Sequence, residues 1–522
     1  MSISRFAGMR RVAAVAAVLA MTGGMAACGP DDSAGAGGVL KVRIAGAMNS
    51  SDPFKEIGSN SWQLLRQVYE GLVSLDDDYN PIPMLAKSWT VSEDQKVYTF
   101  VLRDDVTFHN GKKMTSADVV YSLDYYRQNA TRASQLANIK SVTAAGEHSV
   151  VVTLSAPQAN FLALLGQPIE IVIVPAGAAD NKGLVNSPVG TGPFKVDNFD
   201  NENRVVLKKF DGYVPVDAPA SFFGGRKEAR VDTVVIESVP EDQTALAGIE
   251  THQYDVAIEV PVQDLDRISA VSGVKVESTN GTNTHAAYVN TADPVLKDVK
   301  VRQAIAAAID RKKLLDTTVK GQGEVANSYV SNLVSWFDPT ADDYWPYTGG
   351  VAQAKSLLAE SSYQGQKIEI IAGAPANQKT NATLIAQMLQ DAGFTVAVQT
   401  LDHATYQSRL NAGKFQLAAT GTPLRTPADL LYNEWYCGDD GKPGRFGYCD
   451  AGYDATYRQA TQTADETKRN ALFAQLEKKL KDEAVIMPWY WQKSVWAVSD
   501  KVSGARVAPS GLFSAWNVSL TQ

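Results

Sequence analysis

The sequence predicts an α/β protein with a parallel sheet flanked by helices and an additional hairpin-rich region near the N-terminus. Residues 367–374 and 395–402 each read as a strand followed by a helical segment, and this alternation is typical of parallel sheets. Residues 97–103 place large apolar side chains at every second position, as a half-buried strand does. The 522 residues are enough for more than one lobe.

The remaining elements follow from the same periodicities. Further strands are expected at residues 39–46, 147–155, 169–176, 203–213 and 230–239. Helices are expected at residues 59–76, 116–128, 240–257, 300–319, 377–394, 403–414 and 465–484.

Residues 1–27 are predicted to be a secretory signal. A basic start with three arginines precedes an apolar run, Val12 to Met21, that is too short to span a bilayer as a mature helix. The small residues that lead to Cys28 resemble a bacterial lipobox, so we expect Cys28 to be lipidated and to become the N-terminus. The alternative is an ordinary signal cleaved near Ala27.

Residues 28–38, the lipidated cysteine and a segment without core-forming side chains, predict a flexible tether. The protein is therefore expected to be exported and anchored to the outer face of the cytoplasmic membrane. Loss of the signal changes the formal net charge from −8 to −11, with 46 basic against 57 acidic residues. Because a nucleic-acid partner would require a basic face, none is expected.

The two other cysteines, Cys437 and Cys449, are separated by eleven residues rich in glycine, aspartate and proline. An exported protein meets an oxidising compartment, and a disulfide here would contribute about 3 kcal/mol in the chain-entropy model. The alternative is a two-cysteine metal site, but no histidine or third cysteine lies nearby.

The stretch around His109 brings a histidine, two lysines and a carboxylate together, yet its pattern predicts a turn and a helix start. Asn110 and Gly111 tolerate positive φ and are a strong hairpin signal. Thr115 and Asp118 form a capping box. His109 has no metal partner or adjacent nucleophile in the sequence, so we expect a structural role.

The sequence gives no sign of catalysis. It contains no Gly-x-Ser-x-Gly, no His-Glu-x-x-His and no P-loop, and its five histidines lack ligand spacing. No catalytic residue, metal or cofactor is expected, and a secreted hydrolase is only a remote alternative.

Four segments resemble one known family. Residues 68–123 are similar, almost position for position, to the signature region of family 5 solute-binding proteins, the extracytoplasmic receptors of ABC importers for dipeptides and oligopeptides. Residues 189–199 and 298–315 match two further motifs, and residues 487–492 match a return segment. The resemblance covers essentially the whole mature chain.

The resemblance implies a two-lobe fold of the periplasmic-binding-protein type, with an extra subdomain inserted in lobe I. The expected parts are the lobe I core (residues 39–61, 187–289 and 498–522), the inserted subdomain (residues 62–186) and lobe II (residues 290–497). Segments that cross between lobes would permit hinge closure.

The implied function is that of the substrate-binding component of an ABC importer. It would capture a peptide or peptide-like solute between the lobes and deliver it to a membrane permease with cytoplasmic ATPases, and we expect a monomer. The alternative is the same receptor role for a non-peptide, possibly anionic solute, such as an opine, a sugar derivative or a metal chelate.

In peptide-binding members a lobe II carboxylate, in a Trp-x-x-Asp…Asp-Pro context, binds the ligand's N-terminal amine. Here the two aspartate positions hold Pro423 and Thr426, and Arg425 lies between them. Arg425 suits a carboxylate or phosphate, so we expect a ligand other than a simple free peptide, or another binding mode. The alternative is that Arg425 is a solvated loop residue.

Five further residues are candidates for ligand contact. Asn283, Thr284 and His285 precede the presumed crossing into lobe II, where family members line the cleft. Trp62 and Trp435 could stack on a ligand. A structural histidine at 285 and tryptophans buried in a core are the alternatives.

Overall fold

The structure is a computed structural model. It describes residues 37–521 apart from residues 56–57, 168–170, 201–202, 335, 424–427, 438–440 and 445. The predicted lipidation site Cys28 and the candidate Arg425 therefore lie outside the described residues. Within the described ranges, no helix is both long enough and apolar enough to cross a membrane.

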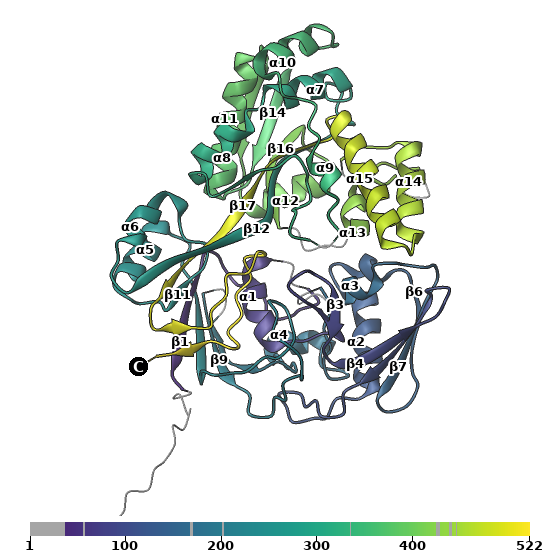
Figure 1. The fold of residues 1–522 in the computed structure, drawn as a ribbon, viewed down its shortest axis with the longest axis vertical. Coiled ribbons are helices and arrows are strands. Elements are labelled where there is room, and N and C mark those ends of the chain that lie inside the picture. Colours follow the sequence, from purple (N-terminus) through teal and green to yellow (C-terminus); the bar gives the residue numbers. More distant parts are fainter. Residues whose placement is uncertain are drawn as a thin grey trace, which may run out of the picture. The chain divides into compact units, whose positions relative to one another are not determined.

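One mixed sheet organises the fold (Figure 1). In the described part of the chain it has eleven strands, and ten of them form a continuous path. Along the path the order is β15 (Thr395–Thr400), β14 (Lys367–Ala372), β16 (Leu417–Pro423), β12 (Val274–Val289), β17 (Ile486–Ser499), β11 (Val256–Ala257), β1 (Val39–Ile44), β10 (Thr233–Ser238), β9 (Arg204–Lys209) and β8 (Phe194–Asp200). The eleventh strand, β13 (Gly323–Val325), pairs with β17.

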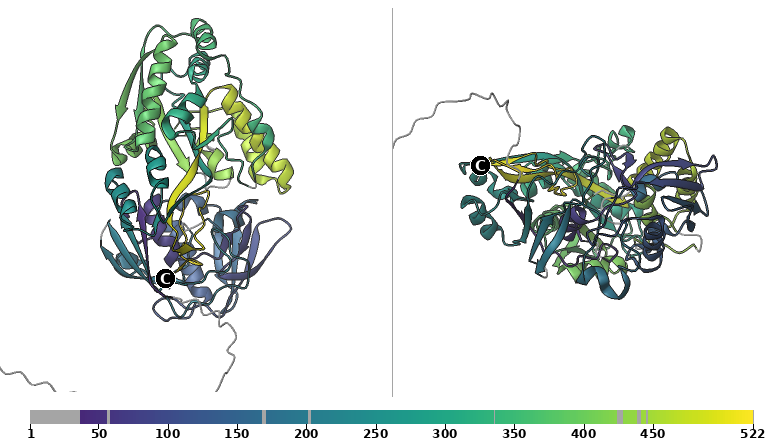
Figure 2. Two further views of the ribbon diagram at one scale, coloured as in Figure 1. Left: turned by 60° about the vertical axis from the view of Figure 1, so that its left-hand side comes forward. Right: turned by 90° about the horizontal axis from the view of Figure 1, so that it is seen from below.

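Two long strands carry this sheet through the molecule. β12 has 16 residues and β17 has 14, and they pair antiparallel with each other. One edge of the pair joins β16 and the other joins β11. Figures 1 and 2 show β17 (yellow) extending from the region of β14 and β16 down to the region of β1 and β11. The two strands thus connect an N-terminal half (β11, β1, β10, β9, β8) with a C-terminal half (β15, β14, β16).

The predicted parallel units are present in each half. β14 pairs in parallel with β15 and β16, and β1 pairs in parallel with β10 and β11. The expected helices after β14 and β15 are α11 (Ala376–Asp391) and α12 (His403–Asn411). The pairings of β12 with β17 and of β8 with β9 are antiparallel, so the sheet is mixed and not purely parallel.

The other helices are amphipathic segments around these strands. The longer ones are α1 (Ser59–Val68), α2 (Ser116–Asn129), α5 (Asp242–Glu250), α7 (Val299–Ala308), α8 (Arg311–Val319), α10 (Gly350–Ala359), α14 (Ala451–Gln462) and α15 (Glu466–Asp482). The shorter ones are α3 (Phe161–Leu165), α4 (Gly183–Asn186), α6 (Leu265–Ser269), α9 (Pro339–Asp342) and α13 (Ala428–Tyr432).

The single helix expected at residues 300–319 is two helices. α7 ends at Ala308, and the carboxylate of Asp310 accepts the backbone N–H of Lys313 to cap the start of α8. Aspartate is a strong N-cap, so it starts a new helix inside an otherwise continuous apolar stripe.

A separate antiparallel sheet forms the predicted hairpin-rich region. Its order is β4 (Ala86–Val91), β5 (Val97–Leu102), β7 (Ser149–Leu154) and β6 (Ile139–Ala144). β5 buries every second side chain, as its alternation predicts. Two small antiparallel pairs complete the strands of the described residues: β2 (Val73–Leu75) with β3 (Pro81–Pro83), and β18 (Val502–Ser503) with β19 (Ser519–Leu520).

The strand expected at residues 169–176 is not regular structure where it is described. Residues 171–174 are buried without belonging to a strand. Two of their backbone N–H groups bind other segments without forming a strand ladder. The N–H of Ile173 donates to the carbonyl of Glu70, and the N–H of Val174 donates to the hydroxyl of Ser122. An apolar run therefore signalled burial here without sheet pairing.

His109 has the structural role that the sequence predicts. Its Nε2 lies 2.9 Å from the carbonyl oxygen of Gly192, and its Nδ1 accepts the N–H of Gly190 at 3.3 Å. Gly111 turns the chain with φ 85°, and the Thr115 N–H donates to the Asp118 carboxylate at 2.9 Å. The stretch docks one chain segment onto another and shows no reactive geometry.

Glu70 also connects segments that are distant in the sequence through hydrogen bonds. Its carboxylate is buried and accepts from Thr191 and from Tyr213, each at 3.0 Å. Lys227, which is also buried, pairs with it at 3.0 Å and lies over the ring of Trp516. Burial lowers the pKa of Lys227, and the charge of Glu70 opposes that shift.

Candidate functional site

Four polar side chains meet where β12 and β17 run side by side. Asn283 and His285 lie on β12, Gln492 lies on β17, and Asn377 lies in the first turn of α11. Asn283 and Gln492 are partners in the strand ladder. Because residues two apart on a strand share a face, Asn283 and His285 point to the same side of the sheet. We call these four residues the crossing cluster.

Gln492 connects the crossing cluster. Its Oε1 lies 2.8 Å from Nε2 of His285 and accepts Nδ2 of Asn377 at 3.2 Å. A carboxamide oxygen only accepts hydrogen bonds, so His285 carries its proton on Nε2 and keeps a lone pair on Nδ1. The same contact orients the amide of Asn377 and leaves its Oδ1 as an acceptor.

His285 is held between two neighbours. Its ring stacks on Tyr490 with centroids 4.6 Å apart, and Gly421 of β16 lies against it. A Cβ at residue 421 would come within 2.8 Å of the imidazole, so only glycine leaves room for this ring. The Tyr490 hydroxyl accepts Nδ2 of Asn381 at 2.9 Å, and Oδ1 of Asn381 accepts the Thr318 hydroxyl at 2.7 Å. A buried network thus supports the cluster from behind.

The crossing cluster is uncharged at neutral pH. Burial lowers the pKa of His285 from 6.5 to about 4, and the contact with Gln492 opposes this only in part. The other three side chains are amides and do not ionise. The site therefore offers dipoles and no net charge.

Three acceptors of the crossing cluster are buried and have no hydrogen-bond partner among the described residues. They are Oδ1 of Asn283, Nδ1 of His285 and Oδ1 of Asn377. A buried polar atom left unpaired costs about 1–3 kcal/mol. Asn283, Asn377 and Gln492 are half-buried as residues, whereas these three acceptor atoms are themselves buried.

An apolar contact between the two halves lies on the opposite face of β12, the face that carries Ala286 and Tyr288. One buried cluster contains Leu75, Tyr79 and Phe223, which precede β12, together with Tyr288, Trp435 and other residues of the C-terminal half. The halves are therefore in contact in this structure. Separating them would expose apolar surface, which disfavours opening without other compensation.

The residues proposed from sequence fall into different surroundings. Asn283 and His285 belong to the crossing cluster. Thr284 faces the opposite side of β12, where its hydroxyl donates to the carbonyl of Tyr329 at 2.8 Å. Trp62 is 4% exposed and belongs to the N-terminal core.

Trp435 is 1% exposed and belongs to the apolar contact between the halves. It stacks on Phe446, with centroids 5.5 Å apart. Arg425 is not described, but β16 ends two residues before it, at Pro423, whose backbone pairs with Asn283.

Sequence reasoning missed Gln492 and Asn377. Gln492 ends the return segment 487–492, whose match to the family motif was a signal for the hinge and not for a site. Asn377 lies at a helix start and has no spacing relation to residue 285. Only the folded sheet brings these residues together.

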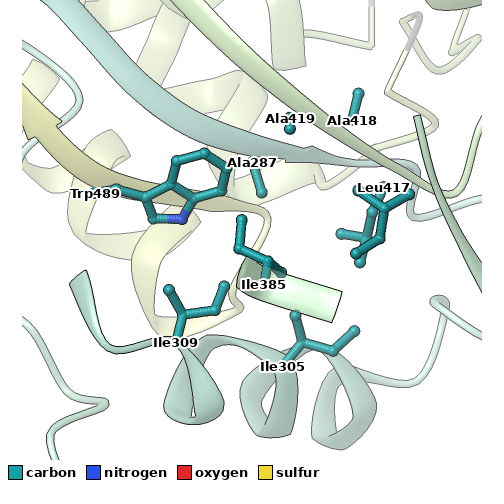
Figure 3. Close-up of a pocket in the computed structure, with 9 residues that line it drawn as sticks. Ala287, Ile305, Ile309, Ile385, Leu417, Ala418, Ala419 and Trp489 are labelled. Carbon is teal, nitrogen blue, oxygen red and sulfur yellow. The ribbon is translucent and has the colours of Figure 1, made fainter. Parts of the chain in front are cut away.

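Two cavities elsewhere do not suit a solute. An apolar cavity of about 10 Å³ lies in the C-terminal core and is lined by Ala287, Ile305, Trp489 and other apolar residues (Figure 3). It is too small for more than about one water molecule. An open hollow of about 590 Å³ is lined by Glu369 and Arg409, but these two form an ion pair with each other.

Comparison with known proteins then identifies the chain. Residues 80–444 match the family described as bacterial extracellular solute-binding proteins, family 5 Middle. The chain belongs to this family. The dipeptide-binding protein DppE of Bacillus subtilis is 26% identical over 505 residues, which are 91% of this chain and 90% of DppE.

Solved structures give the same two-lobe α/β fold for this family 5 solute-binding protein. AgaA of A. tumefaciens, in complex with agropinic acid, matches with a TM-score of 0.80 and 25% identity, over 93% of this chain and 99% of AgaA. NikA of Brucella suis, in complex with Fe(III)-EDTA, matches with a TM-score of 0.81 and 22% identity, over 93% of this chain and 100% of NikA.

Cys437 and Cys449 lie close to each other in the solute-binding protein. Their Cα atoms are 5.1 Å apart, within the usual range for a disulfide. Cys437 is buried and Cys449 is exposed.

Proposed function

We propose that this protein captures a peptide or peptide-like solute between two lobes and delivers it to the permease of an ABC importer. The support is its family and its likeness to a dipeptide-binding protein over nearly the whole chain. The observation that carries the proposal is the pair β12 and β17, which links the two halves of the sheet and bears a cluster of polar side chains at the crossing.

Closure is the central step of this proposal. We propose lobe I as residues 39–61, 187–289 and 498–522, with 62–186 inserted, and lobe II as residues 290–497. A solute that contacts both lobes prefers the closed form, and a preference of about 5.5 kcal/mol moves a two-state equilibrium from 1:99 to 99:1. The solute is bound and released without chemical change.

A non-peptide solute is the second candidate. Pro423 stands where peptide-binding relatives are expected to have an amine-binding carboxylate, and the crossing cluster beside it is uncharged. The solved structures of similar fold include complexes with agropinic acid and with Fe(III)-EDTA.

We further propose that the protein acts as a monomer at the membrane surface. Lipid on Cys28 would anchor it, residues 29–38 would serve as a tether, and Cys437 and Cys449 would form a disulfide after export.

A ligand screen tests the proposed function. Purified mature protein is mixed with peptides, opines, sugars and metal chelates, and its melting temperature and its radius of gyration by X-ray scattering are measured. The proposal predicts that one class raises the melting temperature and compacts the protein. If no class does so, or if a solute is turned over, the proposal is wrong.

A further inference from the structure

The ladder between β12 and β17 contains a bulge where the two strands pass from one half of the sheet to the other. β12 has three residues, 280–282, between its paired residues Thr279 and Asn283. In the same interval β17 has one residue, Lys493. β16 does not extend to residues 280–282 either, because its last pair with β12 is at Asn283. Residues 280–282 are therefore the only residues of β12 without a ladder partner, and we call them the crossing bulge.

The crossing bulge separates the parts of the strand pair that belong to the two halves. On one side of it, β17 also pairs with β11 of the N-terminal half. On the other side, β12 also pairs with β16, and β17 pairs with β13. A second shift of register, between His285 and Ala286, lies within the C-terminal half, where β16 pairs with β12 without a shift. The ladder is thus interrupted between the halves only at the crossing bulge.

A backbone hydrogen bond ties the crossing bulge to the N-terminal half. The N–H of Thr282 donates to the carbonyl oxygen of Pro509 at 3.0 Å, and the hydroxyl of Ser494 donates to the same oxygen at 3.3 Å. Leu512 and Phe513, which follow closely in the chain, belong to the core of the N-terminal half. A bond to a separate segment of this half therefore replaces a ladder bond.

Two side-chain contacts tie the crossing bulge to the C-terminal half. The hydroxyl of Ser331 donates to the carbonyl oxygen of Gly281 at 3.3 Å. Nδ2 of Asn280 donates to Oε1 of Glu324, on β13, at 2.8 Å. Both contacts are present in the position in which the two halves touch. They therefore fix the bulge relative to the C-terminal half in that position.

Gly281 lets the two strands approach each other at the crossing bulge. A Cβ at this position would lie 2.0 Å from the carbonyl oxygen of Gln492, so any other residue would push the strands apart. A bulge bends a strand locally, and hinges concentrate rotation in a few residues between rigid elements. Paired strands resist such rotation through their ladder bonds, whereas residues 280–282 have no ladder partner.

We propose that the crossing bulge is the pivot about which the two halves close, and that Asn280 and Ser331 are positioning residues that favour the closed position. This inference rests on the proposed function. Rotation at residues 280–282 leaves the ladders on both sides intact. The bond from Thr282 to Pro509 stays within the N-terminal half, whereas the contacts of Asn280 and Ser331 join the bulge to the half that moves.

Deletion of Asn280 and Gly281 tests the pivot on the full mature protein. One residue then remains opposite Lys493, so the ladder becomes continuous. Fluorescent labels on Lys209→Cys and Lys355→Cys, at exposed positions of β9 and α10, report the distance between the halves in single molecules without any solute. We expect two distances in the labelled wild type and one in the deletion variant.

A double variant, Asn280→Ala with Ser331→Ala, keeps the crossing bulge and removes both contacts with the C-terminal half. It should change the ratio of the two populations by at least about fivefold toward the longer distance, the effect of one lost hydrogen bond. Ser116→Ala is the matched control, because its buried hydroxyl also donates to a backbone carbonyl, that of Gly146, outside the strand pair. The control should leave the ratio unchanged.

Three results would overturn the inference. They are a deletion variant that keeps both distances, a double variant whose populations equal those of the wild type and the control, and a single wild-type distance that neither variant changes. If the deletion variant does not unfold cooperatively in urea, the double variant alone decides. If a solute from the ligand screen still shortens the distance in the deletion variant, the proposed function stands although the pivot lies elsewhere.

Discussion

The half-buried His109 and the buried His285 should make the stability of this protein strongly dependent on pH. Burial lowers the pKa of both His109 and His285 from 6.5 to about 4. His109 accepts the Gly190 N–H on Nδ1, so protonation at that atom would also break a hydrogen bond. Both side chains are neutral in the folded protein at pH 5 but mostly protonated in the unfolded chain.

The sign and size follow from linkage. A lowered histidine pKa gives stability that is fully present above pH 6.5 and is lost as the pH falls toward 4. With an unfolded pKa of 6.5 and a folded pKa of about 4, each histidine costs roughly 2 kcal/mol of unfolding free energy between pH 7 and pH 5. Together they account for about 4 kcal/mol, a large part of a typical stability of roughly 5–15 kcal/mol.

Urea denaturation at pH 7 and pH 5 measures this loss. The variants His109→Gln and His285→Gln should each be less stable than the wild type at pH 7. Between pH 7 and pH 5, however, the free energy of unfolding of each variant should fall by only about half as much as that of the wild type, because one titrating histidine remains. Asp52 and Asp255 have raised pKa values from burial and offset part of the loss equally in all three proteins. A wild-type loss below about 1 kcal/mol, or equal losses in wild type and variants, would refute the reasoning.

Three further changes have defined outcomes. Glu70→Gln or Lys227→Met leaves a buried charge unpaired and should lower the free energy of unfolding, measured by urea denaturation, by about 3–5 kcal/mol. The double variant should regain part of this stability. A loss of under 1 kcal/mol in both single variants would contradict the prediction. Replacing Cys437 and Cys449 by serine should lower stability by about 3 kcal/mol, and a reductant should destabilise only the wild type. Cys28→Ala should move the protein from the membrane fraction to the soluble fraction, and an unchanged distribution would argue against lipidation.

Local patterns predicted the parts of the fold that depend on near neighbours. The parallel units of β14 and β15, the alternation of β5 and the turn at Gly111 each follow from patterns within about thirty residues. The expected strand at residues 169–176 was wrong because an apolar run reports burial and not sheet pairing. The split between α7 and α8 was not predicted, because the apolar residues keep helical spacing across both helices. The N-cap at Asp310 nevertheless starts a new helix within that pattern.

The site was less predictable because it is assembled from distant segments. Asn283 and His285 could be proposed from their place before the crossing, but Gln492 is more than 200 residues away and Asn377 about ninety. Trp435 looked like a stacking platform, although its surroundings make it part of a buried apolar contact. Residue type alone does not show whether a side chain belongs to the polar cluster or to a buried apolar contact, since its surroundings depend on which strands pair.

The most direct test of the account is a single-molecule distance between the two halves. Fluorescent labels at Lys209 on β9 and Lys355 on α10, both exposed positions, report the relative position of the halves. We predict two distances in the absence of solute, and a shift toward the shorter one when the solute from the screen is added. A single distance that no solute changes would contradict the claim that binding drives closure.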